Sequence, residues 1–299
     1  FTAVWSGAAD DDPLNRLVLL AGLSVRETVL LRAYSRFLRQ VRIPYSVEYM
    51  EDALAGNPGI ARSLVALFHA LFDPANGNDS EAREAEAAGI SDEIEAALEA
   101  VASLDVDRIL RRFHNAIQAT LRTNNYQPDT DGRPKIYVSF KFDCAKLDDL
   151  PLPRPWREIF VYSTWIEGVH LRGGPVARGG LRWSDRKEDY RTEVLGLAKA
   201  QQVKNAVIVP VGSKGGFVVK RPPPTAPRAG RGPIRWVGSP AEQSLPRKYK
   251  TYRRQTRGLK SGCRSHIKDA GRGDAARAGR RRRSDHAAGR NRRIERSRD

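Results

Sequence analysis

The sequence contains only two cysteines, Cys144 and Cys263, and it has no long hydrophobic run. Two cysteines exclude a disulfide framework and any zinc or iron–sulfur site built from cysteine alone, and such sparse use is typical of a reducing compartment. No segment approaches the roughly 20 consecutive apolar residues that a membrane-spanning helix needs, and no signal peptide is visible at the start. We therefore expect a cytoplasmic protein without membrane contacts.

Several familiar ligand motifs are also missing. No GxGxxG segment occurs, so the sequence contains no dinucleotide-binding fingerprint. The segment 212–216 (GSKGG) lacks the first glycine and the Ser or Thr that a phosphate loop requires. The histidines show no metal-ligand spacing; they are His69, His114, His170, His266 and His286. We expect a surface or core-edge role for His114 and an inert structural role for Cys144, while His170 is a weaker candidate for lining a site.

Positive charge is abundant, and all of its excess lies in the last quarter of the chain. Residues 221–299 contain 24 Lys or Arg against 6 Asp or Glu, whereas residues 1–220 contain 28 against 29. The net charge of +17 therefore describes a tail and not the body of the protein. This tail has few large apolar residues, so it cannot bury enough surface to offset the entropy lost on ordering, and we expect disorder.

The pattern before residue 125 predicts helices. Ser24 and Glu27 have the spacing of a capping box, and apolar residues then recur every three or four positions up to a stop at Pro44. Further helices are predicted over about 46–72, 81–100 and 103–122. Residues 74–80, which separate the predicted helices over 46–72 and 81–100, have the composition of a loop.

The pattern after residue 125 predicts strands mixed with a helix. Residues 136–142 alternate as in a half-buried strand, and 158–163 and 165–171 are rich in β-branched and aromatic residues. A helix is predicted over 186–205, followed by a short buried strand over 206–211. We expect an α/β fold with a helical region over 1–125, a partial catalytic domain over 126–220 and the basic tail over 221–299.

The residues best suited to chemistry lie between 168 and 220. Glycine pairs at 173–174, 179–180 and 215–216 stand beside cations. Arginine and lysine can hold carboxylates, and a lysine between a buried strand and a Gly-Gly turn is partly desolvated, which lowers its pKa toward acid–base use. The pattern suggests a site for a small anion, although glycine turns with solvated cations remain the alternative. The candidate cations are Arg178, Lys204 and Lys214.

The segments 176–186 (VARGGLRWSDR), 203–212 (VKNAVIVPVG) and 214–218 (KGGFV) carry a family resemblance. Together with neighbouring motifs over about 151–220, they resemble the large NAD-specific bacterial glutamate dehydrogenases, and the likeness extends more weakly back to residue 110. The resemblance implies oxidative deamination of L-glutamate to 2-oxoglutarate and ammonium. It also implies that Arg178 and Lys204 pair with substrate carboxylates at Gly179-Gly180, and that Lys214 is the catalytic lysine.

The resemblance also sets expectations for cofactor, partners and completeness. Such enzymes use NAD, and we expect a homo-oligomer in the full-length protein. Because the chain begins at Phe1 and its likeness to the family ends near residue 220, we expect a fragment that lacks the NAD-binding domain and is inactive alone. For residues 221–299 we hypothesise a reading-frame shift. The alternative function is a basic protein that binds nucleic acid through this Arg-rich tail.

Overall fold

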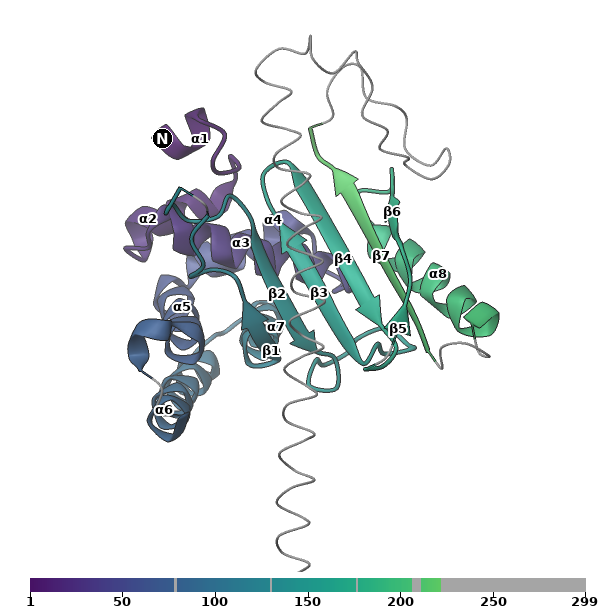
Figure 1. Ribbon diagram of the computed structural model, residues 1–299. Helices are drawn as coiled ribbons and strands as arrows, with labels where there is room; N and C mark the ends of the chain where they lie inside the picture. The colour runs from purple at the N-terminus through teal and green to yellow at the C-terminus, as the bar shows by residue number, and fades with distance from the viewer. Residues whose placement is uncertain (78–79, 130, 176, 206–210, 222–299) are drawn as a thin grey trace, which may run out of the picture. The chain divides into compact units, whose positions relative to one another are not determined.

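The computed structural model describes residues 1–77, 80–129, 131–175, 177–205 and 211–221 (Figure 1). For Arg178 and residues 201–205 it describes the backbone but not the side chains. The chain divides into two compact units, Phe1–Gly232 and Pro233–Asp299, and the second unit lies outside the described residues. The expectation of a disordered tail and the frame-shift hypothesis therefore stay predictions.

The first half of the described chain is helical, as predicted. Its elements are α1 (Thr2–Trp5), η1 (Pro13–Arg16), α2 (Leu17–Leu20), α3 (Val25–Gln40), α4 (Val47–Gly56), α5 (Pro58–Phe72), η2 (Pro74–Asn76), α6 (Ser80–Glu99) and α7 (Leu104–Gln118). The predicted capping box begins α3: the Ser24 hydroxyl accepts from the Glu27 amide, and the Glu27 carboxylate accepts from the Ser24 amide at 2.7 Å.

Three predicted helix boundaries were wrong. Pro44 does not end α3, because the helix stops at Gln40 and Arg42 already turns the chain with a φ of 69°. The predicted helix over 46–72 is two helices, since Pro58 lacks an amide hydrogen to donate and begins α5. The predicted helix over 103–122 ends at Gln118, because the residues after it pair with a distant strand.

The strands form one mixed sheet. In the described residues they are β1 (Thr120–Thr123), β2 (Val138–Asp143), β3 (Arg157–Tyr162), β4 (Ile166–Arg172), β5 (Ala177–Arg178), β6 (Leu181–Trp183) and β7 (Val211–Val219), with α8 (Tyr190–Asn205) between β6 and β7. The order is β1-β2-β3-β4-β7-β5, and β6 also pairs with β7. The pairs from β1 to β4 and on to β7 are antiparallel, whereas β5 and β6 run parallel to β7. The α/β fold class is confirmed.

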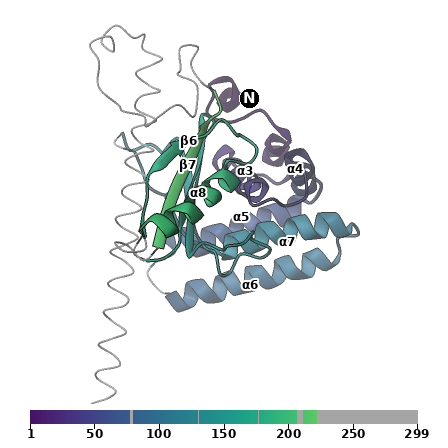
Figure 2. The ribbon, with the colours of Figure 1, turned by 90° about the vertical axis from the view of Figure 1, so that its right-hand side faces the viewer.

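Helices cover one face of this sheet (Figure 2). Phe140 of β2 stacks on Tyr34 of α3 with ring centroids 4.2 Å apart, and Phe142 stacks on Phe37 at 4.1 Å. The residues that alternate with these phenylalanines are buried as well, with Lys141 only 8% exposed. The prediction of a half-buried strand was therefore wrong, since side chains on both faces of β2 are buried. No helix among the described residues is long and apolar enough to cross a membrane.

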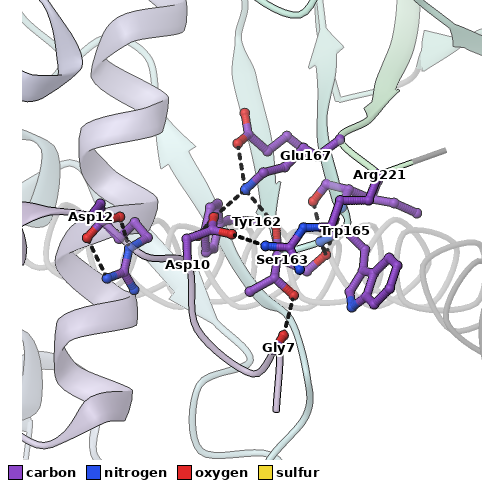
Figure 3. Close-up of polar contacts among 12 residues, drawn as sticks. Gly7, Asp10, Asp12, Tyr162, Ser163, Trp165, Glu167 and Arg221 are labelled. Carbon is purple, nitrogen blue, oxygen red and sulfur yellow. Dashed lines mark hydrogen bonds and ion pairs between the residues drawn. The ribbon is translucent and has the colours of Figure 1, made fainter. Parts of the chain in front are cut away.

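A buried ion network joins the start of the chain to the far end of β7 (Figure 3). It consists of Asp10, Tyr162, Glu167, Lys220 and Arg221, whose guanidinium lies 3.3 Å from the Asp10 carboxylate. The Asp10 carboxylate accepts from the Tyr162 hydroxyl at 2.7 Å and from the Lys220 ammonium at 2.6 Å, and Glu167 lies 3.5 Å from the same ammonium. Burial acts to raise the pKa of Asp10, but Lys220 and Tyr162 outweigh it and hold that pKa below its usual value.

Candidate functional site

The segment that contains Lys214 is a strand and not a turn. We predicted a buried strand over 206–211 followed by a Gly-Gly turn, but β7 runs from Val211 to Val219 through both glycines. Residues 206–210 lie outside the described residues. Pairing on both sides of the strand explains the difference, because β4 bonds to one edge of β7 while β5 and β6 bond to the other.

The strand register brings two of the predicted motifs side by side. Ala177 and Arg178 pair with Val211 and Gly212, and Leu181 pairs with Gly215. The Gly215 amide donates to the Gly180 carbonyl at 3.1 Å. Residues 178–180 therefore lie beside residues 212–214 of β7, the last of which is Lys214.

Most glycines near Lys214 make room for neighbouring protein atoms. A Cβ atom on Gly179 would lie 1.5 Å from the Ser213 carbonyl oxygen, and one on Gly215 would lie 2.2 Å from Leu181 Cδ2. On Gly216 it would lie 2.3 Å from Val194 Cγ2 of α8. Gly180 differs, because its Cβ would meet nothing within 4 Å and the residue is exposed. Of the two site glycines, only Gly180 leaves open space beside its backbone.

The three candidate cations belong to β7 and to two elements that pack against it, β5 and α8 (Figure 1). Lys214 is half-buried in β7 and paired with Leu171 of β4, and it shares the α8-covered face with Gly216 because alternate residues of a strand face the same way. Arg178 lies in β5 against the start of β7, and Lys204 lies in the last turn of α8. For Arg178 and Lys204 the structure describes the backbone and not the side chain.

His170 of β4 does not lie on the face of Lys214. His170 pairs with Gly215 on the opposite face, where it is buried, and burial together with Arg172 lowers its pKa to about 4. Cys144 is a buried free thiol whose pKa is raised by burial, as expected for a structural cysteine. His114 is also buried, and its two ring nitrogens lie 2.7 Å from the Ser91 hydroxyl and 3.1 Å from the Glu95 carboxylate, so it packs between α6 and α7.

Sequence reasoning missed the acidic residues that hold α8 in place. Glu158 of β3 and Arg191 of α8 form a buried bidentate pair with distances of 2.7 and 2.8 Å. Glu193, in the first turn of α8, bonds to Arg182 and Ser184. An acidic residue in the first turn of a helix is a general feature, so the sequence offered no specific signal for the contacts of Glu193. Glu158 and Arg191 are 33 positions apart, so local spacing could not pair them either.

The described residues do not fit a metal, and the connection from β6 to α8 does not fit a dinucleotide. No group of three His, Cys, Asp or Glu side chains within them could hold a metal ion. The connection from β6 to α8, residues 184–189, is where a strand–helix turn could cradle a pyrophosphate, but it contains no glycine. It also contains three acidic residues, Asp185, Glu188 and Asp189, against two basic ones, Arg186 and Lys187, and Arg186 is already paired with Asp189.

Two family profiles match the chain. One is described as bacterial NAD-glutamate dehydrogenase, catalytic domain, and matches residues 93–233. The other is described as glutamate dehydrogenase, helical motif 3, and matches residues 9–74. The catalytic match contains the whole sheet and α8 and continues to residue 233, whereas the sequence motifs placed the end of the likeness near residue 220.

Curated relatives agree with these profiles. The chain is 54% identical over 240 residues to the NAD-specific glutamate dehydrogenase of Mycobacterium tuberculosis, covering 79% of this chain and 15% of that protein. It is 56% identical over 223 residues to the protein of the same name from Pseudomonas aeruginosa, covering 75% of this chain and 14% of that protein. The chain is 53% identical over 229 residues to the NAD-specific glutamate dehydrogenase of Halomonas elongata, and this match covers 76% of this chain and 14% of that protein. The chain thus spans about one seventh of the length of these relatives.

Proposed function

Because the chain belongs to the bacterial NAD-glutamate dehydrogenase family, we propose that it supplies the substrate-binding side of an NAD-dependent glutamate dehydrogenase. The reaction is the oxidative deamination of L-glutamate to 2-oxoglutarate and ammonium. The observation that supports this proposal is the strand register that lays Arg178-Gly-Gly beside Lys214.

The charge of the substrate matches the cations at the start of β7. Glutamate and 2-oxoglutarate each have two carboxylates, and in our proposal Arg178 and Lys204 pair with them. Arginine suits a bidentate pair with one carboxylate, and lysine acts as a point charge on the other. The open space beside Gly180 lets a carboxylate approach the backbone at this edge of the sheet.

In the proposed mechanism Lys214 acts on the carbon that changes oxidation state. As the ammonium it polarises the 2-oxo or 2-imino group through a water, and as the neutral amine it accepts the proton that this water gives up when it attacks the imine carbon. The half-buried position of Lys214 against Leu171 limits competition from bulk solvent. NAD accepts the hydride in enzymes of this family, but we assign no NAD contact to the described residues because the connection from β6 to α8 does not fit a pyrophosphate.

The basic-tail alternative receives no support from the matched proteins, whose names all describe dehydrogenases. It concerns residues 221–299, of which the structure describes Arg221 alone. The substrate-binding proposal is therefore the one that the described geometry favours.

Titration of 2-oxoglutarate into the 299-residue chain by calorimetry tests the proposal. We expect binding that weakens at least tenfold in Lys214→Ala, because the water-mediated contact to the 2-oxo group and a positive charge near the two carboxylates are lost. Lys146→Ala, which removes an exposed lysine outside the site, should bind as the wild type does. Equal affinity in wild type and Lys214→Ala, or no binding at all, would refute the proposal.

A further inference from the structure

The Glu193 carboxylate has two hydrogen-bond donors, and both come from the segment that follows Arg178-Gly-Gly. Arg182 Nε lies 2.5 Å from Glu193 Oε1, and the Ser184 hydroxyl donates to Glu193 Oε2 over 2.5 Å. The Glu193 side chain is 15% exposed, so water competes only weakly for these oxygens. One carboxylate therefore fastens β6 and the residue after it to the start of α8.

Strand β6 in turn fixes the backbone beside Lys214. Its three residues pair with Gly215 to Phe217, and the Ser184 amide donates to the Phe217 carbonyl at 2.9 Å. The Trp183 ring stacks on the Phe217 ring with centroids 6.2 Å apart. A shift of β6 would therefore move Gly180 relative to Gly215, the residue after Lys214.

Helix α8 links the same carboxylate to the third candidate cation. Glu193 lies in the first turn of α8, and Lys204 lies in the last. The helix packs closely on β7, because Val194 occupies the space that a side chain on Gly216 would need. Glu193 thus belongs to α8 and bonds to β6, and these two elements both pack against β7 near Lys214.

We propose that Glu193 is a positioning residue that keeps the Arg178–Gly180 segment in register with Lys214 and with the helix that bears Lys204. This inference rests on the proposed function for its effect on substrate. A carboxylate is suited to the task because it has two acceptor oxygens and no donor hydrogens. A glutamine has one acceptor oxygen, so Glu193→Gln keeps the size of the side chain but satisfies only one of the two donors.

The first test measures 2-oxoglutarate affinity of the 299-residue chain by calorimetry. We expect Glu193→Gln to weaken binding about tenfold, because small displacements of a positioning shell are costly for ligand contacts. The matched control is Glu188→Gln, which removes a carboxylate that is 80% exposed and 4.0 Å from Arg39. That control should bind within twofold of the wild type. Unchanged affinity in Glu193→Gln would overturn the proposal.

The second test does not depend on a ligand. Amide hydrogen exchange is followed at Gly215 and Ser184, whose amides bond across β6 and β7. We expect at least tenfold faster exchange at both amides in Glu193→Gln and no change in Glu188→Gln. The urea midpoint of unfolding is measured in parallel, and an equal rise in exchange across all strands would indicate general destabilisation and overturn the positioning role.

The two tests separate the two proposals. If the wild-type chain binds no 2-oxoglutarate, the proposed function fails, and hydrogen exchange still decides whether Glu193 holds β6. A double variant, Arg182→Ala with Glu193→Gln, adds a further check. If both residues act through their mutual contact, the double variant should lose no more affinity than the more severe single variant, whereas fully additive losses would contradict the inference.

Discussion

The Lys220 ammonium lies 2.6 Å from the Asp10 carboxylate, although the two residues are 210 positions apart in the chain. Their side chains are 19% and 12% exposed, and the Lys220 ammonium also lies 4.6 Å from the centre of the Tyr162 ring. Asp10 lies within the range matched by the helical-motif profile, and Lys220 lies within the range matched by the catalytic-domain profile. This ion pair therefore connects the region that matches the helical-motif profile to the region that matches the catalytic-domain profile.

Removing the Asp10 carboxylate should weaken the fold. We expect Asp10→Asn to lower the free energy of unfolding by about 2 kcal/mol, because it leaves Lys220 and Tyr162 without their shared anionic partner. Urea unfolding followed by circular dichroism measures the effect. The control is Asp52→Asn, whose partner Arg16 lies 3.6 Å away in an exposed pair, and it should change stability by less than about 0.5 kcal/mol.

The buried pair of Glu158 and Arg191 predicts a larger loss. Arg191→Met should lower the free energy of unfolding by about 3–5 kcal/mol, because Glu158 then stays fully buried without a counter-charge. Adding Glu158→Leu to Arg191→Met should recover most of that loss, since an apolar pair of similar volume can replace a buried ion pair. A double variant less stable than Arg191→Met would contradict this account.

Glu51 should make the fold more stable in acid than near neutral pH. Burial, with a smaller contribution from Asp12, raises the pKa of Glu51 from 4.5 to about 7. The folded chain therefore binds this proton more tightly than the unfolded chain. The resulting stability is fully present below about pH 4.5 and is lost as the pH rises through about 7, by about 2–3 kcal/mol.

The variant Glu51→Gln tests this pH dependence. It should be more stable than the wild type at pH 8, and the two should differ much less at pH 5, as measured by urea unfolding across the pH range. Glu48→Gln is the control, because Glu48 is exposed and its pKa lies below the usual value, so its removal cannot produce that gain. An equal effect of Glu51→Gln at both pH values would show that Glu51 is ionised in the folded chain.

The two glycines after Arg178 should respond differently to alanine. Gly179→Ala should destabilise the fold by about 2–4 kcal/mol, because its Cβ would overlap the Ser213 carbonyl and force β5 away from β7. Gly180→Ala should leave the urea midpoint close to that of the wild type, since the added methyl meets open space. If the substrate approaches the backbone at Gly180, the same variant weakens 2-oxoglutarate binding, which calorimetry would detect.

Short-range patterns predicted the elements whose ends are set by their own residues. The capping box at Ser24 located the start of α3, and the β-branched and aromatic runs located β3 and β4. The motifs around Arg178, Lys204 and Lys214 were sufficient to identify the family. Each of these features depends on residue types and spacing within one segment, and such information is present in the sequence.

Contacts between distant segments decided the rest. Glycines 215 and 216 resembled a turn, yet they lie in β7, because β4 and β6 supply hydrogen-bond partners on both edges and leave no room for side chains. The residues after Gln118 join β1 for the same reason. The roles of Glu193 and Lys220 likewise depend on partners in other segments, and strand pairing and ion pairing across a fold cannot be deduced from local spacing. The sequence by itself determined the family, the order of the main elements and the candidate cations, and the tertiary structure decided which backbone lies beside Lys214 and what holds it there.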